Sequence, residues 1–333
     1  MFRLTGLRLG TLALLSAAAV AYTLSTGFAG LELVTEIAIL AMLVVALDLV
    51  AGFGGMVSLC HGALMGVGAY AFAMASTAAG MPVLPSMMLA VGLAGAIAWL
   101  IGALCAGSQG IYFIMVTLAF GQMAYSFVFE SPFFGGDDGL AGISRPDLDL
   151  IGIDLNRSRA FAFYCLGALA ITLLAAAHIL RSGIGRALVG IRDNERRMQA
   201  LGQTVWLTKA HVFGLSGMIA GLAGVLAAQH VMYISPGLLA WTVSGEALVV
   251  VILGGLGTFV GPVLGAAVFV VLRHEVSAIT PYWHLVVGLI LIAVVMSRAN
   301  GIFGFVEDSL ARLSSRRRHT PAEPVVDGET RDA

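Results

Sequence analysis

The sequence predicts an all-α integral membrane protein, a polytopic bundle of about 8–10 transmembrane helices in which broken or re-entrant helices are allowed. Residues of the set AVILMFWYC make up 59% of the 333 residues, a further 42 residues are glycine, and only 11% are charged. Soluble domains carry about 25% charged residues and could not hide so much apolar surface from water. The apolar runs are continuous and about 20 residues long, without the alternation of a barrel strand. Composition therefore excludes a soluble enzyme, a disordered chain and a nucleic-acid binder.

Ten apolar segments predict the spanning helices. In chain order they cover 9–27, 31–51, 57–79, 83–106, 110–129, 160–180, 209–231, 243–258, 260–278 and 283–299. The block 243–278 allows two interpretations, two short spans or one span plus a re-entrant piece, because Gly and Pro interrupt it. Arg3 and Arg8 precede the first run as in a signal peptide, but no small-x-small cleavage site follows. We therefore predict an uncleaved first helix.

The positive charges predict the orientation of the chain. Of 18 Lys and Arg residues, 14 lie before the first span, between residues 181 and 209, or from residue 298 onward. The positive-inside rule therefore predicts that both termini and the 181–208 loop are cytoplasmic, which an even number of spans permits. The acidic loop 130–159 is then external. We expect a membrane domain over 1–300 and a polar, disordered cytoplasmic tail over 301–333.

The chain lacks the residues of a self-sufficient ATPase or metalloenzyme. Lys209 is the single lysine and Thr208 precedes it, so no G-x-x-x-x-G-K-[ST] phosphate loop exists. His274-Glu275 begins like a zinc motif, but Ala278 stands where the second histidine belongs. The three cysteines have no metal or redox spacing. We predict no catalytic residue and no metal site, with one minor alternative: an intramembrane hydrolase built from Ser58, His61 and Asp48.

The segment 181–208 is the largest polar insertion on the predicted cytoplasmic side. Its pattern places apolar residues on one helical stripe, namely Leu188, Ile191, Met198 and Leu201. Asp193 or Asn194 can cap a helix that Gly202 closes, and Asp193 can pair with Arg197 at i,i+4. Two interpretations remain at this point. The segment either docks in a groove of a soluble partner or is an interfacial helix without one.

Ionisable and glycine residues at membrane depth mark candidate packing or pathway positions. Glu246 is the deepest carboxylate candidate, whereas Glu32 and Glu36 lie near an outer helix end where water can reach them. Glycines recur every four residues at 62 and 66 and at 257, 261 and 265. Such stripes bring helix backbones close together, and Gly-Pro interruptions also line transporter cavities. Both interpretations of these glycines stay open.

Several motifs resemble those of one family. GGMVSLCHGALMGVGAYAFA (54–73) resembles G-x-x-S-L-G-H-x-A-f-x-G-i-G-A-Y, and GIYFIMVTLAFGQ (110–122) resembles Y-F-x-I-v-T-L-A-F-G-E. GGDDGLAGI (135–143), GRALVGIRDNERRMQALGQTV (185–205), LSGMIAGLAGVLAA (215–228), YISP (233–236) and VILGGLGTFVGPVLGA (251–266) follow in the same order. By these motifs the chain resembles the permeases of branched-chain amino acid ABC importers, the LivH/LivM permease family, and its Y-F-x-I-v-T-L-A-F-G stretch points to the LivM type.

The resemblance implies a function and partners. It implies a bacterial inner-membrane permease subunit of an importer for branched-chain amino acids or related small solutes. Its partners would be a second, LivH-type permease, two cytoplasmic ATPases that hold ATP and Mg, and an external solute-binding protein. The chain itself would bind no cofactor. The alternative is a stand-alone ion-coupled secondary transporter or channel, with Asp48 and Glu246 carrying the ion.

We predict two sets of functional residues, the first from the resemblance and the second from motif positions and from polar and glycine residues at membrane depth. The ATPase-coupling set is Gly185, Arg186, Ile191, Arg192, Asp193, Glu195, Ala200 and Gly202. The pathway set is Ser58, His61, Thr117, Gln122, Glu246, Gly254, Gly255 and Gly257. The sequence departs from the family pattern at Cys60, at Gln122, in Ser182-Gly183-Ile184, and at Arg196 and Arg197. The family motif has a glutamate where this chain has Gln122, so a negative charge is missing there. Related systems carry urea, short amides or aromatic amino acids, and the transported solute therefore stays open between these and branched-chain amino acids.

Overall fold

The computed structural model describes residues 6–146, 154–297, 301 and 304, and within them the chain is a helical bundle. The helices are α1 (Gly6–Ser25), α2 (Phe28–Ala51), α3 (His61–Ala73), α4 (Val83–Cys105), α5 (Ile111–Glu130), α6 (Ser158–Arg181), α7 (Gly183–Asp193), α8 (Glu195–Ala200), α9 (Val205–Val231), α10 (Trp241–Gly254), α11 (Gly261–Ile279) and α12 (Trp283–Ser297). A π-helical turn, Met74–Ala78, extends α3, and short 3₁₀ turns cover Pro132–Phe134, Gly136–Asp138 and Pro236–Leu239. Two short strands, β1 (Leu140–Ala141) and β2 (Tyr233–Ile234), pair antiparallel with Leu140 opposite Ile234. The predicted all-α membrane fold is confirmed.

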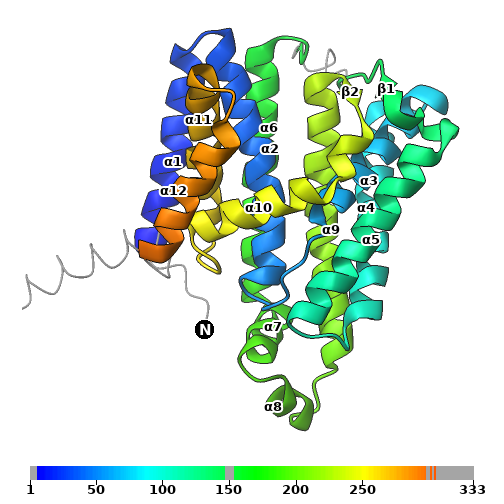
Figure 1. Cartoon of the computed structure of the whole chain (residues 1–333), viewed down its shortest axis with the longest axis vertical. Coiled ribbons are helices and arrows are strands. Elements are labelled where there is room, and N and C mark those ends of the chain that lie inside the picture. The colour runs from blue at the N-terminus through cyan, green and yellow to red at the C-terminus, as the bar shows by residue number, and fades with distance from the viewer. Residues whose placement is uncertain (1–5, 147–153, 298–300, 302–303, 305–333) are drawn as a thin grey trace, which may run out of the picture.

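Within the described residues, six helices are long and apolar enough to cross a membrane: α2, α4, α5, α6, α9 and α11. The most apolar stretches of α2 and α9 are 78% and 72% buried, whereas those of the other four are 22–39% buried. A helix that is apolar on every side belongs in the interior, and the others can present a face to lipid. Figure 1 accordingly shows α2, α6 and α9 in the middle, α1, α11 and α12 on one side, and α3, α4 and α5 on the other.

Small residues bring α9 into close contact with its neighbours. A Cβ added at Gly217 or Gly221 would meet Ala98 or Ala94 of α4, and one added at Gly224 would meet the Met65 carbonyl of α3. Lipid supplies no hydrophobic drive between helices, so such close backbone contact contributes the packing energy. Around α10, Gly62 lies against Ser244, and Gly261 and Gly265 lie against Gly254. At Gly62, Gly261 and Gly265 these contacts agree with the packing interpretation, and the pathway interpretation stays a prediction.

The helices begin and end close to the predicted spans, with two informative differences. Residues 52–60 form no helix, so the third helix starts at His61 and not at residue 57. Gly52, Gly54 and Gly55 favour a turn there, and Gly55 adopts a positive φ of 69°. The helix predicted over 209–231, α9, begins four residues earlier at Val205, so Lys209 lies within the helix and not at its first residue.

The block 243–278 divides into two helices that differ in direction. Residues 255–260 separate α10 from α11. α10 has only 14 residues and is shorter than a spanning helix. Figure 1 shows α10 lying across the long helices at mid-height, whereas α11 runs along them. This agrees with the interpretation of one span plus a shorter, broken piece. Most of the predicted tail 301–333 lies outside the described residues.

Candidate functional site

α7 and α8 project at one end of the bundle, beside the beginning of α9 (Figure 1). We call this end the coupling end. The Ser182 hydroxyl accepts a hydrogen bond from Gly185 N at 3.4 Å and caps α7. Asn194 is extended, and its side-chain oxygen accepts from Arg197 N at 2.9 Å to cap α8. A cap residue needs non-helical backbone, so Asn194 divides the segment into two helices.

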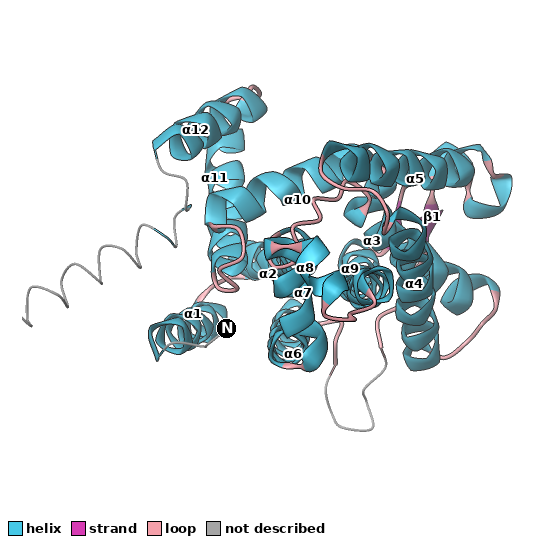
Figure 2. Ribbon diagram, turned by 90° about the horizontal axis from the view of Figure 1, so that it is seen from below, coloured by secondary structure: helices cyan, strands magenta, loops and turns pink. Residues whose placement is uncertain are grey.

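The apolar side of α7 packs onto the bundle. Leu188 and Ile191 are buried, and Met198 of α8 lies against Gly190. Leu201 is 71% exposed, so the predicted stripe does not continue through α8, because the break at Asn194 changes the helix direction. The same break prevents the predicted Asp193–Arg197 pair, and Asp193 lies 3.6 Å from Arg192 instead. Figure 2 shows α7 and α8 seated between the ends of α2, α6 and α9.

Glu195, the first residue of α8, fastens this helix to the bundle. Its Oε2 accepts hydrogen bonds from Lys209 Nζ at 2.9 Å and from Gln109 Nε2 at 2.7 Å. Lys209 Nζ also donates to the Ala106 carbonyl at 3.0 Å. The lysine side chain is 4% exposed and that of Glu195 is 20% exposed. A buried lysine requires such partners, so the pair fixes α8 to α9 and to the 106–110 loop.

Arg192, on the last turn of α7, fastens this helix to α2. Its Nη1 donates to the Gly52 carbonyl at 2.6 Å, just beyond the end of α2. The side-chain stem covers Gly55, where an added Cβ would lie 2.8 Å from Arg192 Cγ. The positive φ of Gly55 and this close contact both disfavour a side chain at that position.

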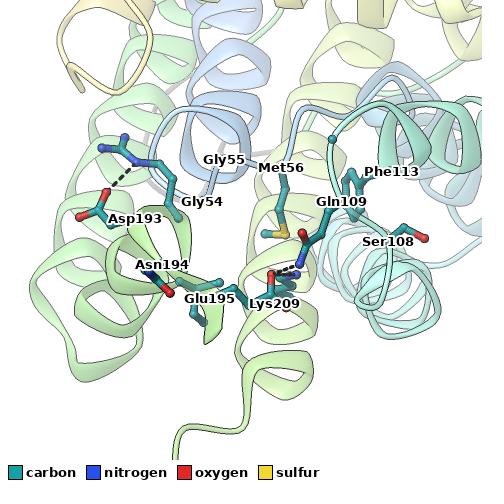
Figure 3. A pocket seen from close by; sticks show the side chains of 13 residues that line it. Gly54, Gly55, Met56, Ser108, Gln109, Phe113, Asp193, Asn194, Glu195 and Lys209 are labelled. Carbon is teal, nitrogen blue, oxygen red and sulfur yellow. Dashed lines mark hydrogen bonds and ion pairs between the residues drawn. The ribbon is translucent and has the colours of Figure 1, made fainter. Parts of the chain in front are cut away.

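A pocket of about 290 Å³ lies between α7, α8 and the bundle (Figure 3). Glu195, Gln109 and Lys209 meet on one side of it, and Asp193, which contacts Arg192, lies on the other. Its remaining lining comes from the two chain segments that follow α2 and α4, from Phe113 of α5, and from Ile191 and Asn194. The pocket therefore adjoins both fastening points of the coupling end.

The structure brings the predicted coupling residues together on α7, α8 and the turn that follows. Gly185 packs tightly on Leu180, and Arg186 Nη1 donates to the Arg181 carbonyl at 2.9 Å. Gly202 has a positive φ of 79° and follows the end of α8, and Ala200 is exposed. Sequence reasoning missed Lys209, Gln109 and Gly52 as partners. The solitary lysine within an apolar helix was the signal that could have indicated an acidic partner.

The predicted pathway residues fall into three separate places. The first holds Ser58, His61 and Thr117, all buried. Ser216 Oγ donates to the Ala46 carbonyl at 2.5 Å and lies 2.8 Å from His61 Nε2, so His61 donates through Nε2. In a neutral imidazole Nδ1 is then the acceptor, 3.1 Å from Ser58 Oγ.

Thr117 completes this first group by accepting from Leu59 N at 3.2 Å. These contacts hold the non-helical segment 52–60 against α5 and α9. No serine–histidine–aspartate triad is assembled, because Ser216, and not Asp48, contacts the second nitrogen of His61. Among the described residues, no group of three His, Cys, Asp or Glu side chains could hold a metal ion.

The second and third places are on α5 and α10. Gln122 is exposed on α5, on a different face from the buried Thr117. Glu246 is half-buried on α10, two residues after Ser244, whose hydroxyl accepts from Gly62 N at 2.8 Å. Gly254 and Gly255 lie at the end of α10, and Gly257 lies in the turn that follows, beside Gly52 at the end of α2. Glu246 thus lies in the first half of α10, and these glycines lie at its end and in the turn that follows.

Several charged side chains to which the sequence analysis gave no functional role form contacts at the end of the bundle opposite α8. Glu32 lies 3.2 Å from His230 Nε2, and Glu36 pairs with Arg273. Arg145 donates to the carbonyls of Gln229 at 3.0 Å and His230 at 3.2 Å, where α9 ends. A guanidinium can satisfy several terminal helix carbonyls at once.

Comparison with known proteins places this architecture in a family. Residues 29–295 match the family described as branched-chain amino acid transport system / permease component. The chain belongs to this family. We found no match among solved structures.

The relatives are permease proteins of bacterial import systems. The LivM protein of the Salmonella typhimurium high-affinity branched-chain amino acid transport system is 26% identical over 280 residues, which cover 78% of this chain and 66% of LivM. LivM of Escherichia coli K12 is 26% identical over 272 residues, 75% of this chain and 64% of the relative. MglC, a galactose/methyl galactoside import permease of the same strain, is 24% identical over 54% of each chain. The chain thus spans slightly less than two thirds of the length of the LivM proteins.

Proposed function

We propose that this permease is the transmembrane subunit of an ABC importer for branched-chain amino acids or related small solutes. The observation that best supports this proposal is that the α7–α8 segment projects from the bundle yet is attached to it through Glu195 and Arg192. A segment that only lay on a membrane surface would not need rigid attachment to two central helices. Displacement of α7 and α8 would move α2 and α9, as alternating access requires.

The coupling end is proposed to face the cytoplasm, with both termini on that side. The 181–209 region carries six of the 18 positive charges, as the positive-inside rule expects. Two ATPase subunits would bind ATP and Mg, and one would receive α8 in a groove. The exposed Arg196, Arg197 and Leu201 would enter that groove. A LivH-type permease and an external solute-binding protein would complete the importer in the inner membrane.

For the pathway, we propose different roles for the three places. Gln122 and Glu246 would contact the solute, because they are the members of the set with polar side chains that are not fully buried. Ser58, His61 and Thr117 would shape the pathway by holding segment 52–60, since their polar atoms are engaged with one another and with neighbouring chain. Gly254, Gly255 and Gly257 would permit the close turn beside α2.

The test is uptake by proteoliposomes that contain this chain, its second permease and both ATPases, with the binding protein outside. Arg192→Glu and Gly202→Asp are expected to abolish uptake and transport-coupled ATP hydrolysis, because each alters the attachment or ending of the coupling helices. Arg157→Glu is the matched control: the same charge change on a side chain that is 82% exposed, far in sequence from the coupling helices. Normal uptake by both coupling variants would contradict the proposal. Uptake by the purified single chain, driven by an ion gradient without ATP, would favour the secondary transporter.

A further inference from the structure

Asp48 is a buried carboxylate that the coupling and pathway sets do not include. It lies on the last turn of α2 with 2% of its surface exposed. Its Oδ1 accepts a hydrogen bond from the backbone N of Gly257 at 2.6 Å, across to the turn between α10 and α11. An ionisable side chain is expensive in an apolar bundle. A short bond to a turn distant in sequence indicates that this side chain holds that turn.

The same turn of α2 contacts the coupling helix on its other side. Gly52 N donates to the Asp48 carbonyl at 2.8 Å, and the Gly52 carbonyl accepts from Arg192 Nη1 at 2.6 Å. The residues are four apart, so both contacts belong to a single helical turn. Arg192 of α7, Asp48 of α2 and Gly257 are thereby joined through two short hydrogen bonds.

The backbones of Gly52 and Gly257 touch without an intervening side chain, whereas α7 reaches Gly52 through the Arg192 side chain. A Cβ added at Gly52 would meet Asp48 Oδ1 and lie 2.5 Å from Gly257 N. Gly257 has a positive φ of 72°, and a Cβ there would lie 3.1 Å from the Gly52 carbonyl oxygen. Direct backbone contact is stiffer than contact through long side chains, because no rotamer can absorb a small displacement.

The turn that Asp48 holds sets the position of α10. Beyond it, Gly254 is pressed against Gly261, and Gly265 against Val250 and Gly254, so the end of α10 and the start of α11 move together. α10 carries the half-buried Glu246. A shift of this turn would therefore reach the proposed pathway.

We infer that Asp48 is a positioning residue that ties the α10–α11 turn to the coupling helix, so that movement of α7 is transmitted to α10. This inference rests on the proposed function. Two separate sets of contacts then leave the coupling end. One set connects α8 to α9 through Glu195 and Lys209. The other connects α7 to α10 through Arg192, Gly52, Asp48 and Gly257. Loss of Asp48 uncouples α10 and leaves the ATPase contact in place.

The test uses the whole reconstituted importer with Asp48→Leu, which matches the side chain in size but removes the acceptor, and Asp48→Asn, which keeps an acceptor oxygen. In Asp48→Leu we expect assembly and basal ATP hydrolysis as in the parent, while uptake falls by about tenfold or more, because the Gly257 N–H loses its acceptor. Asp48→Asn is expected to restore part of the uptake. Thr172→Val, a buried polar change on α6 without a hydrogen-bond partner, is the matched control and is expected to leave uptake unchanged.

A spectroscopic readout separates transmission from a merely structural role. Spin labels at Ile252→Cys on α10 and Val231→Cys on α9 occupy exposed positions, and the native Cys60, Cys105 and Cys165 are buried. The distance between the labels is expected to change on ATP and vanadate trapping in the parent and to stay fixed in Asp48→Leu. An unchanged ATP-driven shift and full uptake in Asp48→Leu would overturn the inference.

Two further outcomes are decisive. If the parent complex itself shows no ATP-driven uptake, the proposed function fails, and this inference fails with it. If Asp48→Leu does not assemble, Asp48→Asn and Arg192→Leu are compared singly and together. One continuous link predicts that the double variant is no worse than the worse single variant. Independent, additive losses would overturn the link while leaving the proposed function intact.

Discussion

Lys209, the single lysine of the chain, is expected to contribute to stability through its buried ion pair with Glu195. The buried ammonium has Glu195 at 2.9 Å and the Ala106 carbonyl at 3.0 Å as partners. We predict that Lys209→Met lowers the free energy of unfolding by about 3 kcal/mol, because it leaves the Glu195 carboxylate without its countercharge. Denaturant unfolding in mixed micelles measures this change.

The double variant Lys209→Met with Glu195→Gln is expected to lose less than the single variant, since no unpaired charge then remains. The exposed pair of Arg157 and Asp154 is the control, and Arg157→Met should change stability by less than about 1 kcal/mol. Equal losses from both single lysine and arginine variants would contradict the buried-pair argument.

At this scale, the sequence predicted the members of the coupling segment but not their partners. Arg192 and Glu195 follow from the motif GRALVGIRDNERR. Gly52 and Gln109 precede them by more than 80 residues, and no local pattern specifies which distant carbonyl or amide a side chain will reach. Those pairings depend on how α2, α4 and α9 pack, and that is fixed only by the whole bundle.

The positions of the long helices were the most predictable feature of the fold, because hydropathy alone identifies a run of about 20 apolar residues. What hydropathy cannot show is a break inside an apolar run. Residues 57–60 are apolar enough to count as helix, but buried hydrogen bonds of Ser58 and Thr117 hold them in a non-helical path. α10 is equally apolar, and its direction across the bundle is set by contacts at Gly62 and Gly261.

The glycines of α9 are expected to be needed for stable packing between the helices. We expect Gly224→Ala to destabilise the bundle by about 1–3 kcal/mol, because the added methyl group would press on the Met65 carbonyl. Thermal unfolding in detergent measures the effect. Gly167→Ala on α6 is the control: nothing lies within 4 Å of its added Cβ. This helical position should gain roughly 0.5–1 kcal/mol, and destabilisation equal to that of Gly224→Ala would refute the packing argument.

Across the whole molecule, α9 connects the two ends of the bundle. Lys209 lies near its beginning, and its last carbonyls accept from Arg145, whose guanidinium also lies 4.1 Å from the centre of the Phe161 ring. The sequence could not show that α2 and α9 are central, since their neighbours are about as apolar. Burial on all sides depends on packing partners that composition does not reveal.

We predict that Arg145→Lys loosens the loop around β1, because an ammonium cannot make the forked contacts of a guanidinium with Gln229, His230 and Leu155. Hydrogen exchange of residues 140–146 should become at least several-fold faster, while exchange of α7 stays the same. Arg159→Lys serves as control, since Arg159 makes one 3.5 Å contact with the Thr26 carbonyl at an exposed site. Unchanged protection in Arg145→Lys would show that the strand pair alone orders the loop.

The break at Asn194 has a consequence for how such a transporter can evolve. Of the residues of α8, Glu195 supplies the polar anchor and Met198 a packing contact, while Arg196, Arg197, Gln199 and Ala200 are exposed. Substitutions at those four positions leave the fastening of the bundle unchanged. Under the proposed function, the exposed surface of α8 can therefore change independently of folding, and Arg196 and Arg197, at which the sequence departs from the family pattern, lie in this part.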